Sequence, residues 1–209
     1  MRRNILIIMV VPLSLVGNTR WVSAADPDKG KTYFEACQSC HGVRGEGTPA
    51  APRLGGQPMW YTVHQLQNFR SDMRGNHESD VNGQLMRSMA RLLPDDQAAQ
   101  DVAAYLARQE TPPPARTESS GRPQQGKTVY SGCQACHGQL GQGNASVGGP
   151  RLAGQHDWYL IMQLQNFRSG LRGVHEQDTY GRTMRLMAQT LLPDEQAIKD
   201  VAAYIATLP

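Results

Sequence analysis

Apolar side chains recur at helical spacing in two stretches of the first half of this chain. In residues 59–73 they lie three residues apart, which predicts an amphipathic helix that ends at Gly75. A second stripe follows Pro94-Asp95-Asp96, whose acidic side chains suit a helix N-terminus. The stripes consist of Trp60, Val63, Leu66 and Phe69, and of Ala98, Val102, Tyr105 and Leu106. No segment alternates convincingly between apolar and polar residues, so the predicted fold class is all-α.

Another helix is expected near the start of the chain. Asp26 and Pro27 are typical of an N-cap and a first helical turn, and the predicted helix runs into Cys37. Residues 42–56 are rich in glycine and should form a loop with tight turns.

The same order of segments returns in the second half of the chain. The offset between matching segments grows from 96 to 98 to 99 residues, which indicates small insertions in loops. Matching pairs are Gly30-Lys31-Thr32 and Gly126-Lys127-Thr128, Pro52-Arg53-Leu54 and Pro150-Arg151-Leu152, and the segments 65–70 and 163–168, and 101–105 and 200–204. We therefore predict two homologous domains, residues 25–110 and 126–209. Residues 111–125 are rich in proline, serine and threonine and should form an extended, semi-rigid linker.

The N-terminal segment has the pattern of a secretory signal peptide. Arg2 and Arg3 precede an apolar run over residues 5–16, and Val22-Ser23-Ala24 resembles a cleavage site. The alternative is a membrane anchor, but about 12 apolar residues are fewer than the roughly 20 that span a bilayer. We expect residues 1–24 to be removed on export to the periplasm.

The charge of the remaining chain is balanced. Without the three arginines of the N-terminal segment, 18 basic residues face 18 acidic ones. Such a chain has no footprint for nucleic acid. Aromatic residues make up only 6% of the sequence, so a large apolar cofactor would form a substantial part of each core.

Each domain carries one Cys-x-x-Cys-His motif, the pattern for covalent attachment of haem c. Two thiols at this spacing reach two vinyl groups of one porphyrin, and the adjoining histidine binds the iron. The motifs place the thiols at Cys37 and Cys40 and at Cys133 and Cys136, and the histidines at His41 and His137. Disulfides, a redox dithiol or a zinc site are the alternatives, but a thioredoxin-like βαβ pattern is missing and zinc would need distant segments to converge. We predict two haem c groups.

The second axial ligand of each iron should occur in both repeats. Methionine suits this position because a thioether favours reduced iron. Met86 pairs with Met184 and Met89 with Met187, whereas other methionines lack a methionine partner. The matched histidines, His77 and His175, could form a bis-histidine site, but their charged and polar neighbours favour exposed loop positions.

Together, the haem motifs, the Pro-Arg-Leu-(Gly/Ala)-Gly-Gln segments and the Met-x-x-Met pairs before a final Asp-Val-Ala-Ala-Tyr helix resemble cytochrome c4, a family of periplasmic two-haem electron carriers. The resemblance covers essentially all of the mature chain. It implies that Met86 and Met184, seven residues before Leu93 and Leu191, are the axial ligands, with Met89 and Met187 as alternatives.

The resemblance has further implications for the surroundings of the haem. The carbonyls of Pro52 and Pro150 would accept hydrogen bonds from the ligating histidines. Arg53 and Arg151 would lie near the haem propionates, where a guanidinium suits a carboxylate, although an unpartnered surface arginine is the alternative.

The expected function is transfer of single electrons between respiratory complexes, for example from a quinol-oxidising complex toward a terminal oxidase, with only transient docking to membrane complexes. A cytochrome subunit of a periplasmic dehydrogenase is the main alternative. A haem peroxidase with one open iron position is the other, but the sequence has no distal acid-base pair at a recognisable spacing. We therefore expect an electron carrier and not an enzyme.

Overall fold

The computed structural model describes residues 24–209, and the predicted signal peptide lies outside the described residues except for Ala24. Within the described range the chain forms α-helices and one short 3-10 helix, and its only β-type pairing is an isolated bridge between Asn144 and Gly149. The all-α prediction is confirmed.

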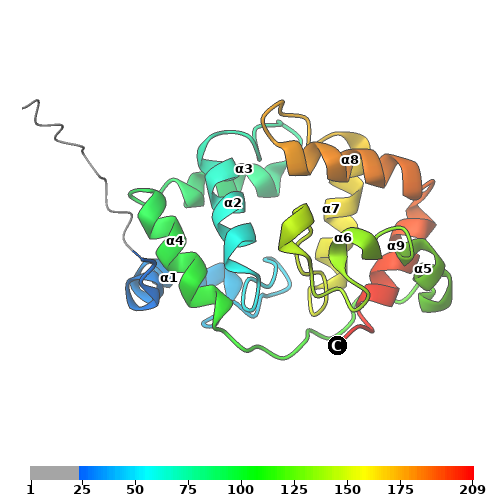
Figure 1. Cartoon of the computed structure of the whole chain (residues 1–209), viewed down its shortest axis with the longest axis horizontal. Helices are drawn as coiled ribbons and strands as arrows, with labels where there is room; N and C mark the ends of the chain where they lie inside the picture. The colour runs from blue at the N-terminus through cyan, green and yellow to red at the C-terminus, as the bar shows by residue number, and fades with distance from the viewer. Residues whose placement is uncertain (1–23) are drawn as a thin grey trace, which may run out of the picture.

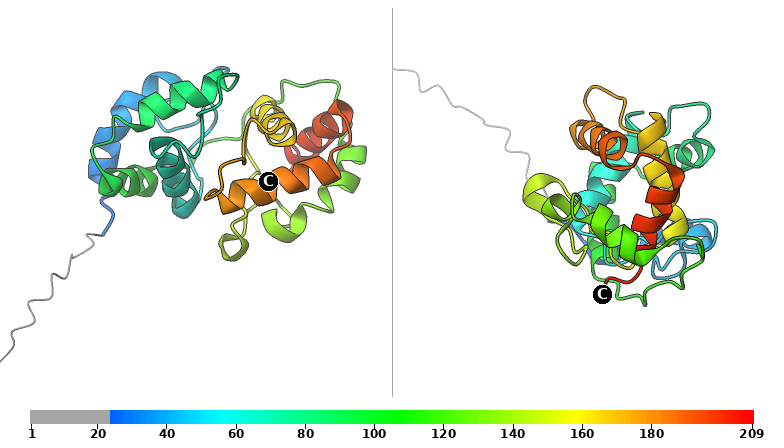
Figure 2. Two further views of the ribbon diagram at one scale, coloured as in Figure 1. Left: turned by 90° about the horizontal axis from the view of Figure 1, so that it is seen from above. Right: turned by 90° about the vertical axis from the view of Figure 1, so that its right-hand side faces the viewer.

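Two helical domains lie side by side, joined by a connection without helix that runs along one edge of the molecule (Figures 1 and 2). The first domain contains α1 (Pro27–His41), α2 (Met59–Arg70), α3 (Val81–Ala90) and α4 (Asp96–Ala107). The second contains α5 (Pro123–Tyr130), α6 (Gln134–His137), the 3-10 helix η1 (Ala145–Val147), α7 (Asp157–Ser169), α8 (Thr179–Leu191) and α9 (Glu195–Ile205).

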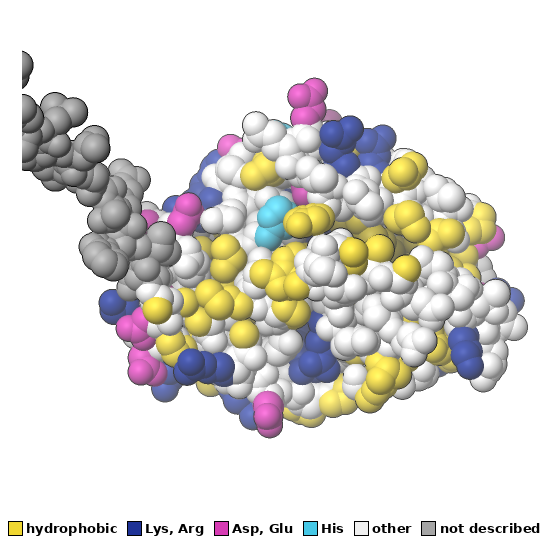
Figure 3. Space-filling view, in the orientation of Figure 1, with side chains coloured by type: hydrophobic (Ala, Val, Ile, Leu, Met, Phe, Trp, Pro, Cys, Tyr) yellow, Lys and Arg dark blue, Asp and Glu magenta, His cyan; other side chains and the backbone are white. Residues whose placement is uncertain are grey.

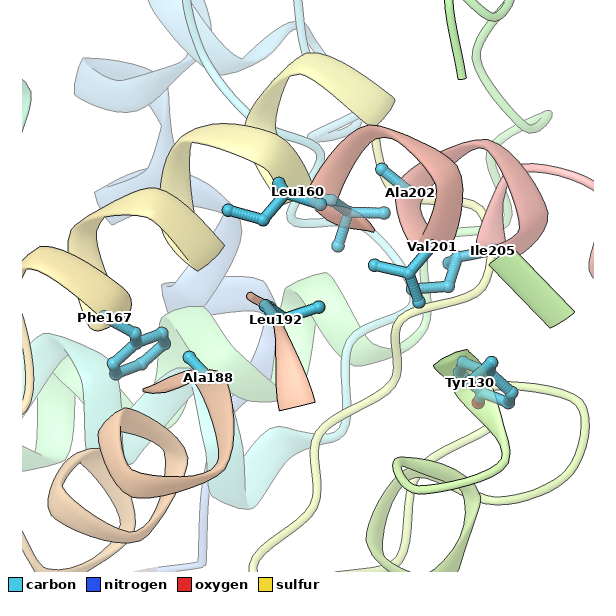
Figure 4. Close-up of a cluster of buried hydrophobic side chains, with 9 residues drawn as sticks. Tyr130, Leu160, Phe167, Ala188, Leu192, Val201, Ala202 and Ile205 are labelled. Atoms are coloured by element: carbon cyan, nitrogen blue, oxygen red, sulfur yellow. The ribbon is translucent and has the colours of Figure 1, made fainter. Parts of the chain in front are cut away.

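In each domain the first and last helices cross at a glycine. A Cβ atom added at Gly30 would lie 1.9 Å from the carbonyl oxygen of Asp101 in α4, and one added at Gly126 would lie 1.9 Å from that of Asp200 in α9. The close approach buries a small apolar core beside each crossing. These cores contain Phe34, Leu93, Val102 and Leu106 in the first domain, and Tyr130, Leu160, Phe167, Leu192 and Val201 in the second (Figure 4).

The first helix differs between the domains. α1 starts at Pro27, with Asp26 as its N-cap as predicted, but it continues through both cysteines to His41. In the second domain the equivalent stretch is divided into α5 and α6. Gly132 takes the place of Ala36 at the break, and glycine is about 1 kcal/mol less favourable than alanine inside a helix.

The predicted extent of the second helix was too long. α2 ends at Arg70, because Asp72 turns into the left-handed region with φ 63°. α7 ends at Ser169, where Gly170 takes the same kind of conformation with φ 82°. In the first domain the apolar pattern continued past Arg70 and so predicted a longer helix, although the backbone leaves the helical conformation at Asp72.

The connection between the domains is extended, yet the second domain holds it at two places. The backbone nitrogen atoms of Thr117 and Glu118 each donate to a carboxylate oxygen of Asp157 over 2.7 Å. Further along, Arg122 donates to Asp200 from its backbone nitrogen over 2.8 Å and from its guanidinium over 2.7 Å. The connection is thus anchored to α7 and α9.

The bonds at Asp200 predict an acid-sensitive anchor. Hydrogen bonds led by the Arg122 side chain lower the pKa of Asp200 to about 2. Because this folded-state pKa lies below the ordinary carboxyl value of about 3.9, the stabilisation is complete above that value and is lost as the pH falls through about 2. We expect Asp200→Asn to lower the free energy of unfolding at pH 7 but to match the unchanged protein near pH 2, as measured by denaturant titrations at a series of pH values. A difference that is independent of pH would contradict the assignment.

Charges are dispersed over the surface. On the face shown in Figure 3 basic and acidic side chains are interspersed, with most of the acidic ones over the first domain. This agrees with the sequence, because residues 26–110 carry 9 basic and 11 acidic side chains. Among residues 24–209, no helix is both long and apolar enough to cross a membrane.

Candidate haem sites

The two Cys-x-x-Cys-His motifs lie at matching places in the two domains. Cys37, Cys40 and His41 occupy the last turns of α1, and the second motif comprises all of α6 together with its N-cap Cys133. All four cysteines are free thiols. Cys37 and Cys133 are half-buried and pack against the apolar cores, whereas the second cysteine of each motif is exposed. None of the four cysteines is joined to another by a disulfide in the described structure.

The surroundings of the thiols suit attachment of an apolar group. Burial, followed by the neighbouring Cys40, raises the pKa of the Cys37 thiol. Burial and Cys136 raise the pKa of Cys133 to about 11. Within the described part of the chain, no three side chains of His, Cys, Asp or Glu gather in a way that could hold a metal ion by themselves.

Both motif histidines are held in one orientation by a backbone carbonyl. The Nδ1 atom of His41 lies 2.8 Å from the carbonyl oxygen of Pro52, and that of His137 lies 2.9 Å from that of Pro150. Each histidine is only 7% exposed, and burial is the main cause that lowers the pKa of both. A neutral ring that donates from Nδ1 keeps a lone pair on Nε2. The donor set therefore fits an iron-binding imidazole.

The methionine pairs lie on matching helices. Met86 and Met89 are half-buried on α3, and Met184 and Met187 are half-buried on α8. Met184 also packs against the core of the second domain.

The step in the repeat offset from 98 to 99 residues places one extra residue in the second domain, after its methionine pair. Ala90 and Ala188 are both buried at the usual offset of 98, but α8 then continues to Leu191. The leucine that matches buried Leu93 is Leu192, which is 3% exposed, so Met184 lies eight residues before it whereas Met86 lies seven before Leu93. The insertion thus lengthens the end of α8 without moving the methionines out of register.

The other matched histidines take part in local turns. The Nδ1 atom of His77 accepts a hydrogen bond from the backbone of Ser79 over 3.1 Å, and that of His175 accepts one from Gln177 over 3.2 Å. Both side chains are half-buried. These bonds give the two histidines a role in shaping the loops before α3 and α8.

Arg53 and Arg151 lie close together where the domains meet. Both line a cavity of about 10 Å³, together with glycine and glutamine residues of the two domains. Nε of Arg53 donates to the carbonyl of Gly55 and Nη1 to that of Gly154, each over 3.0 Å. Burial and the charge of Arg151 lower the pKa of Arg53. Neither arginine forms an ion pair with a described acidic residue.

Sequence reasoning missed a polar network that crosses the domain interface. Arg74 of the first domain donates to Gln163 of the second over 2.9 Å and to Tyr159 over 3.1 Å. Arg172 of the second domain donates to Gln65 of the first over 2.9 Å and to Tyr61 over 3.3 Å. The two sets are equivalent, because each arginine donates to the glutamine and tyrosine that occupy matching positions in the other domain. The sequence did contain a hint of this network, because each of its residues is matched by an identical residue 98 positions away in the other domain.

The network is largely buried and has further members. Arg74 and Arg172 are buried, and their guanidinium groups lie 4.4 and 4.3 Å from the ring centroids of Phe69 and Phe167. A second pair of equivalent hydrogen bonds joins the loops that precede α2 and α7. The amide of Gln57 donates to the carbonyl of Arg151 over 2.8 Å, and that of Gln155 donates to the carbonyl of Arg53 over 2.9 Å. These contacts fix the two domains relative to each other.

Two all-α domains, each with a thiol pair and a carbonyl-oriented histidine, define a two-haem c-type cytochrome. The sequence profile of the cytochrome c family matches residues 27–110 and again residues 123–209. The chain belongs to the cytochrome c family, and within it to the cytochrome c4-like proteins with two covalently bound haem c groups. It is an electron carrier and not an enzyme.

Individual relatives agree with this assignment. Cytochrome c4 of Stutzerimonas stutzeri is 30% identical over 98% of this chain and 99% of its own length. The crystal structure of reduced recombinant cytochrome c4 from Pseudomonas stutzeri matches with a TM-score of 0.73 at 30% identity, covering 89% of this chain and 100% of that one. A thiosulfate dehydrogenase electron acceptor from Stutzerimonas stutzeri strain A1501 is 31% identical over 83% of this chain and 79% of its own length.

Proposed function

We propose that this protein shuttles single electrons between respiratory complexes in the periplasm, for example from a quinol-oxidising complex toward a terminal oxidase. The observation that carries the proposal is the duplicated histidine site, with the same Nδ1-to-carbonyl contact in both domains. Bound haem supplies a one-electron ferric/ferrous couple. A fixed imidazole orientation limits rearrangement when the iron changes valence, which suits repeated electron transfer.

Met86 and Met184 are the proposed axial ligands opposite His41 and His137. Support comes from their common register on α3 and α8. Met89 and Met187 are the alternatives, because they share the same two helices. A thioether ligand favours reduced iron and so raises the reduction potential.

Arg53 and Arg151 are proposed to bind haem propionates. Two guanidinium groups share a small cavity without a described acidic partner, and a carboxylate accepts hydrogen bonds from such a group. Pro52 and Pro150 are proposed to act on the iron indirectly, by orienting the ligating histidines through their carbonyls.

Export is part of the proposal. The predicted cleavage after Ala24 would release the described domains into the periplasm, where haem c can be attached. The near balance of charges supports brief contacts with redox proteins, including complexes in the membrane, and offers no footprint for nucleic acid.

A second candidate is the role of electron acceptor for a periplasmic dehydrogenase. The observation that favours it is the likeness to a thiosulfate dehydrogenase electron acceptor over 83% of this chain. The two candidates share their electron chemistry and differ only in the protein that delivers the electrons.

Reaction with separate donors and acceptors tests the choice. Oxidised holo-protein is mixed with a quinol and quinol-oxidising membranes, or with thiosulfate and a purified thiosulfate dehydrogenase, and haem reduction is followed by stopped-flow absorbance. The reduced protein is then mixed with membranes containing a terminal oxidase, with and without cyanide. Fast quinol-dependent reduction and cyanide-sensitive reoxidation are expected. Fast reduction by the dehydrogenase together with no reaction with the membranes would favour the second candidate.

A further inference from the structure

Asp72 has an unusual backbone conformation at the end of α2. It is the only non-glycine residue within residues 24–209 with a positive φ, at 63°. This left-handed conformation is unfavourable for a residue with a Cβ atom, although aspartate and asparagine tolerate it better than most. The second domain has Gly170 at the matching position, with φ 82° and no such penalty. Surrounding contacts must therefore hold Asp72 in place.

Those contacts come from the methionine-bearing helix. Both carboxylate oxygens of Asp72 lie 2.7 Å from Nη2 of Arg91, and Oδ1 lies 3.2 Å from Nη1 of Arg87. Arg87 lies between the two methionines of α3, and Arg91 is the residue that caps its end. One carboxylate thus ties the end of α3 to the end of α2. The two cations also suit the negative end of the α3 dipole.

The first turn of α3 is held by contacts of its own, so the Asp72 carboxylate acts on the last turn. A Cβ atom added at Gly75 would lie 2.2 Å from the carbonyl oxygen of Gly83, which places the loop directly against the first turn of α3. Asp80 caps this turn by accepting from the backbone nitrogen of Gly83 over 2.9 Å. The second domain repeats both features at Gly173 and Asp178, so they do not distinguish the domains.

The contacts at the other end of the helix do distinguish them. Arg185 matches Arg87 but faces Gly170, which has no carboxylate to offer. The Nε atoms of both arginines are buried without a hydrogen-bond partner, but Arg87 pairs with Asp72, whereas Arg185 forms no ion pair with another described residue. Gln189 stands where the first domain has Arg91, and its amide donates to the carbonyl of Arg168 over 3.1 Å. A single neutral hydrogen bond therefore replaces two ion pairs.

We propose that Asp72 is a positioning residue that clamps α3 through Arg87 and Arg91, so that the axial methionine of the first domain is displaced less readily than that of the second. The inference rests on the proposed methionine ligation. Movement of the methionine-bearing turn would make displacement of the sulfur easier, and the clamp opposes this movement at the end of the helix. Two half-exposed ion pairs on one carboxylate correspond to an effect of about tenfold on the displacement equilibrium.

Competition by imidazole measures this effect directly. Imidazole is added to the oxidised full-length holo-protein, and loss of the near-infrared absorption of sulfur bound to ferric haem is followed. Met86→Ala and Met184→Ala proteins assign the two phases. The expected apparent Kd for imidazole is about tenfold higher at the first haem than at the second. Similar values at the two haems, or weaker competition at the second, would overturn the proposal.

Two variants separate positioning from general stability. Asp72→Asn removes the charge and keeps a side chain that tolerates the left-handed conformation, whereas Asp72→Gly copies the second domain and relieves the strain. Both are expected to lower the apparent Kd at the first haem about tenfold and to leave the second haem unchanged. No change in both variants, or equal changes at both haems, would overturn the clamp.

Arg91→Gln provides a matched substitution, because it copies Gln189 of the second domain. It should shift the first haem in the same direction as the Asp72 variants, and an unchanged Kd would count against the assigned ion pair. The near-infrared spectrum of the unchanged protein tests the proposed methionine ligation independently of the clamp. Absence of the near-infrared band before any imidazole is added would overturn methionine ligation itself, and with it the clamp.

Discussion

Replacing Met86 by alanine is expected to remove about half of the near-infrared sulfur-to-iron absorption of the oxidised protein, and Met184→Ala should remove the other half. Each sulfur is proposed to ligate one of two irons, so each loss affects one haem. The reduction potential of the affected haem should fall, because the thioether that favours reduced iron is gone. Near-infrared spectra and potentiometric titrations of the two variants measure both effects.

Met89→Ala and Met187→Ala are the matched controls for this prediction. They remove a methionine from the same helices, α3 and α8, three residues further on. The band should persist in both controls. A band that disappears in the controls and persists in the Met86 and Met184 variants would move the ligand to the second methionine of each pair.

Gly126→Ala is expected to destabilise the second domain by about 3 kcal/mol, because a new Cβ would overlap a backbone carbonyl. The added carbon would lie 1.9 Å from the oxygen of Asp200, so α5 and α9 would have to separate. This movement would also disturb the core at Tyr130 and Val201. Guanidinium unfolding of the holo-protein, followed separately by helix signal and haem absorbance, measures the loss.

Gly132→Ala is the control for this steric effect. The nearest atoms to its added carbon would belong to the Leu191 side chain, which can turn away, and alanine favours helix at the break between α5 and α6. Its stability should therefore stay close to that of the parent protein or increase. Equal losses for Gly126→Ala and Gly132→Ala would contradict the helix crossing as the cause.

Local chemistry made much of this fold predictable from the sequence. The N-cap at Asp26 and the acidic start of α4 are short-range signals, and Asp26 and Asp95 accept hydrogen bonds from the first turns as such residues should. The histidine motifs were equally local, since spacing alone identifies them. The internal repeat then extended each conclusion to the second domain.

Features that depend on tertiary contacts were less predictable. The end of α2 depends on a residue held in a left-handed conformation by α3, and apolar periodicity carries no information about that contact. The break before α6 coincides with a single glycine, Gly132. Glycine lowers the stability of a helix only slightly, so tertiary contacts decide whether the helix continues past it. The interface arginines looked like ordinary polar residues, because burial arises only when the second domain covers them.

The exchanged contacts of Arg74 and Arg172 have the form of an isologous interface, in which one surface pairs with its own copy. Each domain thus offers the other the same kind of surface, as the two subunits of a symmetric homodimer do, although both belong to one polypeptide. Tethering makes the association intramolecular and raises the effective concentration of each half for the other. The halves are then free to diverge, as His64 and Met162 have: these matched residues now lie 3.8 Å from Asp178 and 3.3 Å from Asn82, respectively. The tandem chain therefore holds two similar haem sites whose surroundings differ in residues of the opposite domain.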